Sequence, residues 1–293
     1  MVLPPFLKSL EEQHWFDVFV SYWFAEDLRH GDLTSESIFL PDQRARAVIV
    51  AREAGRLCGR SVVEYIWRRY VPEGQCQGLL ADGEFFRYGS RLITLEGPTI
   101  QLLMFERPLL NLLQHLSAIT TQSAQWSEKV RPYGTRLLAT RKTTPGLRWL
   151  EKWAVELGGV LPHRRDLSEE VMIKDNHADA TGSLSEAVRK VVERLKQRGM
   201  ERPIVVEVRS INDIEQIRPW WERIDRILLD NFTPEEVKTA VDTYGDVLTF
   251  EASGGIHEAN LLDYAQTGVP YLSSSAVHRP QRPLDLSMRI EFE

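Results

Sequence analysis

The second half of the chain repeats one short pattern, in which an apolar run ends in polar side chains and a helix-like stretch follows. The runs end at six polar positions: Arg141, Lys174, Glu207, Asp230, Ser253 and Ser275. Their spacing of roughly 20 to 35 residues suits one strand, one helix and two loops. Strands that alternate with helices form a parallel sheet. Nearly continuous apolar strands favour a closed barrel over an open doubly wound sheet, but the pattern excludes neither architecture.

Helix start and stop signals lie between these runs. Thr144 and Pro145 would supply an N-cap and a first helical residue, and Gly158 would end that helix. Capping boxes begin at Ser183 and Thr233, each with a glutamate three residues later. These signals predict helices between the apolar runs, as the strand-helix reading requires.

The first 130 residues have a different pattern. Residues 44–53 alternate as a strand with one wet face, residues 59–70 are typical of a helix, and residues 84–97 indicate more strand. A long helical stretch from residue 99 to 130 contains Pro108, which would start or kink it. We therefore expect an α+β domain over residues 1–116 and a barrel domain over residues 117–293. The last residues would be free to return to the first domain.

Composition limits the possible partners. The chain has 293 residues, 43% of them apolar, and a net charge of −6. An acidic chain argues against a nucleic-acid partner held by bulk electrostatics, so a local basic cluster would need a small anion. Cys58 and Cys76 show no metal-type spacing. The N-terminus shows no secretory pattern and no apolar run reaches the ~20 residues of a membrane span, which predicts a cytoplasmic protein without a membrane partner.

Charged side chains collect at the ends of the predicted strands, where α/β proteins of either architecture bind ligands. The groups that can be cationic or donate hydrogen bonds are Arg141, Lys142, His163, Arg164 and Lys174. Glu207 and Asp230 would face them from later strands. Ser253 and Gly254 begin a small-residue turn that suits backbone N–H groups near a phosphate. Each signal also has a simpler interpretation, such as a Lys174 that pairs only with Asp175. Because all of these residues are expected at one rim of the sheet, an anion site is favoured.

Several segments, taken in order over nearly the whole chain, resemble quinolinate phosphoribosyltransferase, also called nicotinate-nucleotide pyrophosphorylase (carboxylating). The segments are EDLRHGDLTS, FERPLLNLLQHLSAITT, TRKTTPGLRWLEKWAVELGG, HR, MIKDNH, EV, ILLDN and EASGGI. Their combination is far more specific than any one of them. The resemblance implies an open-faced α/β sandwich followed by an incomplete parallel α/β barrel. It also implies a dimer in which the sandwich of one subunit completes the barrel site of the other.

The same resemblance implies a reaction and a set of roles. Quinolinate and phosphoribosyl pyrophosphate (PRPP) would give nicotinate mononucleotide, pyrophosphate and CO2, with Mg²⁺ accompanying the pyrophosphate. The quinolinate carboxylates would be held by Arg107, Arg141, His163 and Arg164. Lys142 and Lys174 would meet the phosphates. Glu207 and Asp230 would hold the ribose hydroxyls and the metal, and with Lys174 they would form the catalytic set. The 5′-phosphate would lie against Ser253 and Gly254.

Elementary chemistry agrees with these roles. The two substrates are highly anionic, and guanidinium groups match carboxylates and phosphates in bidentate geometry. Loss of pyrophosphate builds positive charge on the anomeric carbon, which carboxylates beneath the ribose would stabilise. A ribosylated ring nitrogen then stabilises the carbanion that forms as CO2 leaves, so no organic cofactor is expected.

Some positions depart from the family pattern, and they leave other functions open. Glycines of the family correspond here to Val160, Asp166 and Ser275, and two later residues become His278 and Arg279. Ser275 stays a candidate for PRPP binding, either narrowing the loop or adding a hydroxyl. Three alternatives remain: a homologue associated with molybdate transport that acts on another ring, a Schiff-base lyase that uses Lys174, and a ligand-binding descendant without catalysis.

Overall fold

A computed structural model describes residues 6–291 of the chain. The fold divides into two compact units, of which the first spans Met1–Gln122, Thr144–Gly158 and Pro280–Glu293. The second spans Ser123–Thr143 and Gly159–Arg279. Helix α4 (Thr99–Val130) runs through Pro108 without ending, and the boundary expected at residue 116 falls inside it. Within residues 6–291, no helix is both long and apolar enough to cross a membrane.

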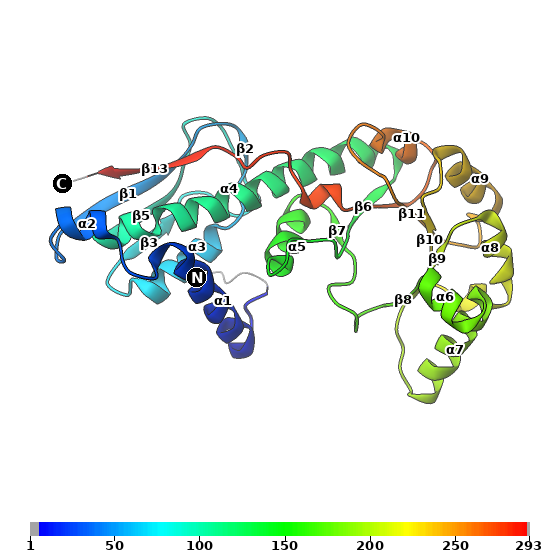
Figure 1. Cartoon of the computed structure of the whole chain (residues 1–293). Helices are drawn as coiled ribbons and strands as arrows, with labels where there is room; N and C mark the ends of the chain where they lie inside the picture. The colour runs from blue at the N-terminus through cyan, green and yellow to red at the C-terminus, as the bar shows by residue number, and fades with distance from the viewer. Residues whose placement is uncertain (1–5, 292–293) are drawn as a thin grey trace. The chain divides into compact units, whose positions relative to one another are not determined.

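The first unit is built on a four-stranded antiparallel sheet with the order β13-β1-β5-β3. These strands are β1 (Arg44–Ala51), β3 (Gln75–Gly78), β5 (Arg91–Pro98) and β13 (Leu286–Glu291). The last strand therefore pairs with the first, as the red and blue arrows in Figure 1 show. The segment expected as strand over 84–97 forms two strands, β4 (Phe85–Phe86) and β5. Strand β4 pairs with the short strand β2 (Gly55–Arg56).

Helices complete the first unit. They are α1 (Leu10–Leu28), α2 (Leu33–Ile38), α3 (Arg60–Tyr70), the first part of α4, and α5 (Arg148–Leu157). The expectation that Thr144 and Pro145 start α5 is wrong, because the helix begins at Arg148 after a turn. The Glu151 carboxylate instead accepts a hydrogen bond from the Thr144 backbone N–H at 3.1 Å and pairs with His115 Nε2 at 3.0 Å.

The second unit is a curled, seven-stranded parallel sheet with the order β7-β6-β12-β11-β10-β9-β8. The strands are β6 (Arg136–Ala139), β7 (Leu161–Pro162), β8 (Val171–Ile173), β9 (Ile204–Val208), β10 (Arg226–Asp230), β11 (Phe250–Ser253) and β12 (Tyr271–Ser274). Strands β7 and β8 follow each other in sequence but form opposite edges of the sheet. The parallel sheet is confirmed, whereas the closed barrel favoured by the strand pattern is wrong: the barrel is incomplete.

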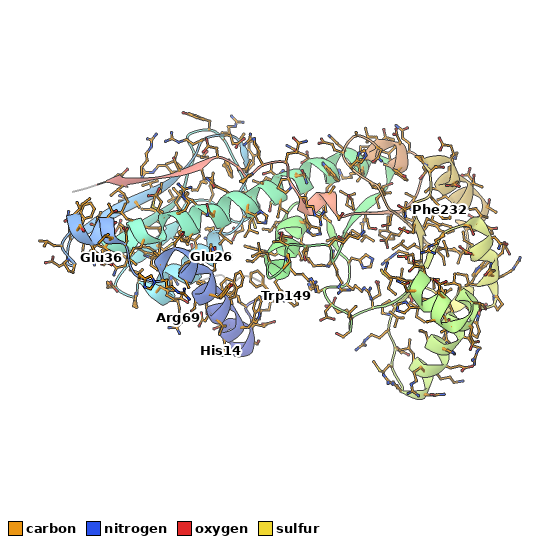
Figure 2. All side chains as sticks on the ribbon, viewed as in Figure 1. His14, Glu26, Glu36, Arg69, Trp149 and Phe232 are labelled. Carbon is orange, nitrogen blue, oxygen red and sulfur yellow. The ribbon has the colours of Figure 1, made fainter. Side chains whose placement is uncertain are left out.

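The second unit also contains helices between these strands, and 3₁₀ turns that lie before, between or after them in the chain. The helices are α6 (Asp175–Thr181), α7 (Leu184–Gln197), α8 (Ile211–Gln216), α9 (Pro234–Tyr244) and α10 (Leu261–Ala265). The 3₁₀ turns are η1 (Arg131–Tyr133), η2 (Arg218–Arg223) and η3 (Ala276–His278). Phe232, labelled in Figure 2, is buried between β10 and α9, and its carbonyl accepts a hydrogen bond from Tyr264 Oη of α10 at 2.9 Å. This contact fixes the loop that follows Asp230.

Thr233 forms the expected capping box with Glu236, whereas Ser183 is confirmed only as an N-cap, because the Glu186 carboxylate pairs with Arg189. The Ser183 side chain accepts from Glu186 N at 3.2 Å, and Thr233 Oγ1 accepts from Glu236 N at 3.2 Å. The Glu236 carboxylate accepts in return from Thr233 N at 2.8 Å. These bonds satisfy N–H groups that the first helical turn leaves without partners.

We expect Thr233→Ala to lower the free energy of unfolding by about 1 kcal/mol, because the first turn of α9 loses its cap. Thr239→Ala, at an exposed position in the middle of α9, is the matched control and should change stability by less than about 0.5 kcal/mol. Urea denaturation followed by circular dichroism measures both. Equal losses in the two variants would show that the cap contributes nothing special.

Candidate functional site

A pocket of about 310 Å³ opens at the carboxyl ends of the strands of the second unit. The predicted residues that line it are Arg141, Lys142, His163, Arg164, Lys174, Glu207, Asp230 and Ser253. Other lining residues are Thr140, Met172, Leu228, Glu251 and Ser273, which the sequence reading missed. Arg107 lies on α4 in the first unit. Arg107 is not among the residues that line this pocket, whereas the parallel register brings the lining residues together because they lie in or just after the carboxyl-terminal parts of neighbouring strands.

Lys174 and Glu207 form an ion pair across the ends of β8 and β9. Glu207 is only 8% exposed in an otherwise apolar, fully buried strand. Asp175, which could have been the partner of Lys174, instead pairs with Arg209. Lys174 is therefore positioned by a carboxylate inside the pocket, and its plainer reading as a surface pair with Asp175 is wrong.

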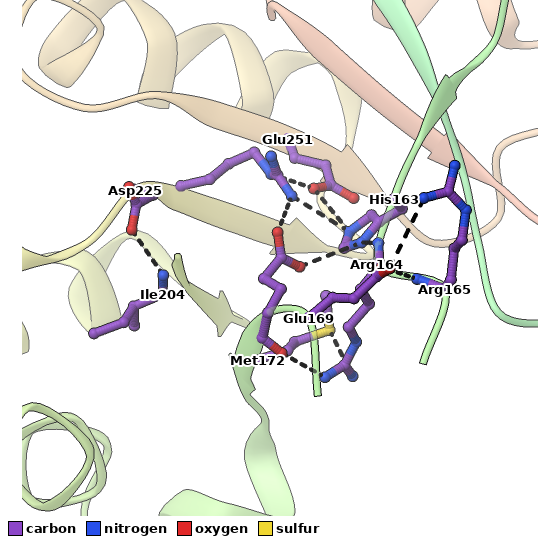
Figure 3. A network of polar contacts seen from close by, with 10 residues as sticks. His163, Arg164, Arg165, Glu169, Met172, Ile204, Asp225 and Glu251 are labelled. Carbon is purple, nitrogen blue, oxygen red and sulfur yellow. Dashed lines mark hydrogen bonds and ion pairs between the residues drawn. The ribbon is translucent and has the colours of Figure 1, made fainter. Parts of the chain in front are cut away.

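Arg141 and Arg164 give the pocket an excess of positive charge on one side. Among the described residues, Arg141 Nε is buried without a hydrogen-bond partner. Arg164 donates from Nη1 to the Glu170 carbonyl at 3.2 Å, and its Nη2 lies 3.5 Å from Met172 Sδ, as Figure 3 shows. Burial, and then the charge of Arg141, lower the pKa of Arg164 below its usual range, while Glu170 opposes them. Two guanidinium groups that line one pocket and repel each other favour an anionic ligand.

A buried ion network around His163 forms part of the pocket wall, because His163 and Glu251 both line the pocket (Figure 3). His163 Nδ1 is 3.3 Å from Glu170 Oε1, and His163 Nε2 is 3.4 Å from Glu251 Oε2. Arg226 bridges the same two glutamates, at 3.1 Å to Glu170 and 2.6 Å to Glu251. Burial raises the pKa of Glu251, but the hydrogen bond and charge of His163, then Arg226 and Ser273, outweigh burial and leave that pKa lowered. Glu251 is therefore ionised.

The residues that follow β10 and β11 lie against each other, and this contact requires glycine at position 254. Asn231 has a φ of 58° and donates from its backbone N–H to the Ser253 carbonyl at 2.8 Å. Gly254 has a φ of +94°, and a Cβ built on it would lie 2.7 Å from the Asn231 backbone nitrogen. Asn231 Nδ2 also donates to Asp230 Oδ2 at 2.8 Å. These contacts thus fix the Asp230 carboxylate and bring backbone close to the pocket rim.

Comparison with known proteins identifies the family. Residues 119–289 match the model described as quinolinate phosphoribosyl transferase, C-terminal domain, and residues 32–117 match the N-terminal domain. The chain belongs to this family. A probable nicotinate-nucleotide pyrophosphorylase [carboxylating] of Synechocystis is 36% identical over 277 residues, which cover 94% of this chain and 92% of that protein. The chloroplastic nicotinate-nucleotide pyrophosphorylase of Arabidopsis thaliana is 33% identical over 92% of this chain and 81% of its own length.

A solved structure agrees. The nicotinate-nucleotide pyrophosphorylase of Ehrlichia chaffeensis superimposes with a TM-score of 0.87 at 32% identity, covering 94% of this chain and 98% of that one. The sandwich and incomplete barrel expected from the resemblance to quinolinate phosphoribosyltransferase are therefore confirmed.

The departures from the quinolinate phosphoribosyltransferase pattern have local explanations. Val160 is 2% exposed and fills core space before β7. Asp166 accepts from both the backbone and the hydroxyl of Ser168 at 2.7 Å, and these bonds lower the pKa of Asp166. Ser275 has a φ of −75°, which any residue adopts, so its backbone does not need glycine. His278 is buried in the η3 turn.

We expect Gly254→Ala to destabilise the protein more than Gly255→Ala does. Both positions have positive φ, which costs an alanine about 1 kcal/mol, but only Gly254 has backbone against its added methyl group. Gly255 has nothing within 4 Å of a built Cβ. Urea unfolding of the two variants should differ by about 1 to 3 kcal/mol, the cost of overpacking. Equal unfolding midpoints would show that the close approach of Gly254 to Asn231 does not restrict the side chain at position 254.

Proposed function

We propose that this protein transfers the phosphoribosyl group of PRPP to quinolinate and releases CO2, giving nicotinate mononucleotide and pyrophosphate for NAD biosynthesis. Membership of the quinolinate phosphoribosyltransferase family supports this reaction. The observation that carries it is the pocket itself, which is lined by the guanidinium groups of Arg141 and Arg164 and by the carboxylates of Glu207 and Asp230. The first suit a dicarboxylate, and the second suit a sugar that becomes positively charged.

The basic side of the pocket would bind the ring. Arg141 and Arg164 supply planar donors for the two adjacent carboxylates, and Met172 and Leu228 supply apolar contact for the ring face. His163 also lines the pocket, but its ring nitrogens face Glu170 and Glu251, so the two arginines would make the main contacts with the carboxylates. In the proposed arrangement Arg107 of the partner subunit would close the site.

The acidic side would act on the sugar. As the bond between the anomeric carbon and pyrophosphate breaks, the ring nitrogen of quinolinate forms a bond to that carbon, which is positively charged in the transition state. Glu207 and Asp230 would stabilise that charge and hold the ribose hydroxyls. Lys174 and Lys142 would receive the departing phosphates, and Ser253, Gly254 and Ser275 would hold the rest of PRPP. Lys174 would exchange its contact with Glu207 for the more highly charged pyrophosphate.

Magnesium fits this chemistry as a companion of PRPP. Glu207 and Asp230 offer carboxylate oxygens, the ligands that Mg²⁺ prefers. Within residues 6–291 no group of three or more His, Cys, Asp or Glu side chains is arranged to hold a metal alone. We therefore propose that phosphate oxygens and water complete the shell, and that the bound ion offsets negative charge on the leaving pyrophosphate.

Loss of CO2 requires only tight binding of the ring. Once the ring nitrogen carries the ribose, it is positively charged, and the electron pair left at the adjacent carbon is stabilised beside it. That carbon then takes a proton from solvent. The arginines would hold the remaining carboxylate while the other departs.

The direct test is to incubate the purified protein with quinolinate, PRPP and Mg²⁺ and to quantify products by chromatography and CO2 trapping. We expect one CO2 for each nicotinate mononucleotide. Nucleotide formation without CO2 from another ring would favour a related phosphoribosyltransferase, and borohydride trapping of Lys174 with a carbonyl compound would favour a lyase. A cytoplasmic location stays a prediction.

Arg164→Lys keeps the positive charge but loses the planar fork. We expect quinolinate binding to weaken by about 1 to 3 kcal/mol, the range for hydrogen bonds to charged groups, with little change in PRPP binding. Arg165→Lys is the matched control, because Arg165 pairs with the exposed Glu169 instead. Calorimetry with each substrate measures both variants. Unchanged quinolinate affinity in Arg164→Lys would move this arginine out of contact with the ligand.

Glu207→Gln should lower kcat more than it weakens quinolinate binding, because its interaction strengthens as the anomeric carbon becomes positive. We expect a loss in kcat of at least about tenfold, or 1.4 kcal/mol. Steady-state kinetics with both substrates varied separates the two effects. Wild-type turnover in this variant would make Glu207 a structural residue only.

We also propose a homodimer in which each site combines Arg107 of one subunit with Glu207 of the other. Arg107→Ala and Glu207→Ala homodimers should each be nearly inactive, because every site lacks one group. A mixed dimer has one intact site and one doubly defective site, so subunit exchange should restore activity in proportion to the heterodimer population. Mass spectrometry would quantify that population. Heterodimers without recovered activity would show that Arg107 does not act on the partner's site.

A further inference from the structure

Arg164 is held at both ends by residues that lie close to it in the chain. Its backbone N–H donates to His163 Nδ1 at 2.9 Å. At the tip of the side chain, Nη1 donates to the Glu170 carbonyl at 3.2 Å, and Nη2 lies 3.5 Å from Met172 Sδ (Figure 3). A guanidinium group has five N–H donors in one plane, so two donors held in place set the direction of the other three. The Glu170 carbonyl therefore helps to decide where the fork of Arg164 points.

Glu170 belongs to a segment with no regular backbone structure of its own. Residues 163–170 form neither helix nor strand, and β8 begins at Val171. The peptide group between Glu170 and Val171 has one backbone anchor, because the Val171 N–H donates to the Pro203 carbonyl at 2.9 Å. The second anchor is the Glu170 side chain, whose Oε2 accepts from Arg226 Nη2 at 3.1 Å. Arg226 thus restrains the peptide group whose carbonyl accepts from the fork.

Arg226 lies close to the pocket but is not among the residues that line it. Side chains two residues apart in a strand share one face, so Arg226 points the same way as Leu228 and Asp230, which do line the pocket. It lies nearer the amino end of β10 than they do. Its side chain is 16% exposed, and its Nε donates to Glu251 Oε2 at 2.6 Å. This ion pair with a fully buried carboxylate fixes the guanidinium group.

We propose that Arg226 is a positioning residue for the dicarboxylate site. By holding Glu170 it sets the orientation of Arg164, and through Arg164 it sets the affinity for the ligand without touching it. The identity of that ligand as quinolinate rests on the proposed function. A lysine at position 226 keeps the charge but has no planar fork with which to bridge two carboxylates. We expect that lysine to stay with the fully buried Glu251 and to release Glu170.

Calorimetry with benzene-1,2-dicarboxylate tests the proposal, because this probe has two adjacent carboxylates and no ring nitrogen that could react. Arg226→Lys should weaken its binding about three- to thirtyfold, within the range of coupling between residues of one hydrogen-bonded network. Arg189→Lys is the matched control, because Arg189 also bridges two glutamates, Glu186 and Glu193, but on helix α7. It should change the affinity by less than about twofold. In turnover with quinolinate, Arg226→Lys should raise the KM for quinolinate and leave kcat and the KM for PRPP unchanged, whereas a loss of folded enzyme would lower kcat.

Two further variants test the route from Arg226 to the ligand. In an Arg164→Lys background, Arg226→Lys should change the affinity by less than about twofold, because no planar fork is left to orient. Glu170→Ala keeps the backbone carbonyl, removes the side-chain anchor and leaves Arg226 paired with Glu251 alone. It should weaken binding as Arg226→Lys does, and it decides the question if Arg226→Lys does not fold. Glu169→Ala, at the exposed neighbour, is its control and should bind as the wild type does.

Several results would overturn the proposal. They are wild-type affinity in Arg226→Lys and Glu170→Ala, an equal loss in Arg189→Lys, the full loss repeated in the Arg164→Lys background, and a wild type that does not bind benzene-1,2-dicarboxylate. Failure of the proposed function is read separately. In that case the probe would bind with the expected pattern across the variants, but the wild type would form no nicotinate mononucleotide from quinolinate and PRPP.

Discussion

Parallel pairing of the strands in the second unit is the constraint on which the site depends. Because β6 and β8 to β12 all run in one direction, their carboxyl ends share one edge. Residues that are more than a hundred positions apart, such as Arg141 and Ser253, therefore line the same pocket. An antiparallel neighbour would place its corresponding side chains at the opposite edge. The chemistry of the site follows from this register.

Charge of both signs lines the pocket at that edge. Its cations are Arg141, Lys142, Arg164 and Lys174, and they offer an anion site on a protein whose net charge is −6. Glu251 and His163 also line the pocket, and with Glu170 and Arg226 they form one buried network. Buried carboxylates beside an anion site would oppose binding if they were uncompensated. Their ion pairs with Arg226 compensate them.

The sequence predicted the parallel sheet, the caps at Ser183 and Thr233, and the side chains that end each strand, because these depend on local pattern and spacing. It did not predict the start of α5, because a turn closed by the Leu147 N–H and the Thr144 carbonyl precedes the helix, and Leu147 occupies the N-cap position. Glu251 was missed because it lies inside an apolar run, although a carboxylate in a buried strand is itself a signal that a partner must exist. Its partner Arg226 begins another strand, and only the folded register brings them together.

The most direct test of this account is the ratio of kcat/KM for quinolinate to kcat/KM for nicotinate, measured with saturating PRPP and Mg²⁺. Nicotinate lacks the second carboxylate and cannot use both Arg141 and Arg164. The account predicts a preference for quinolinate of at least about a hundredfold, or 2.7 kcal/mol, because a site built for a charged group is left unpaired without it. Equal values for the two rings would contradict the conclusion that this pocket is built for a dicarboxylate.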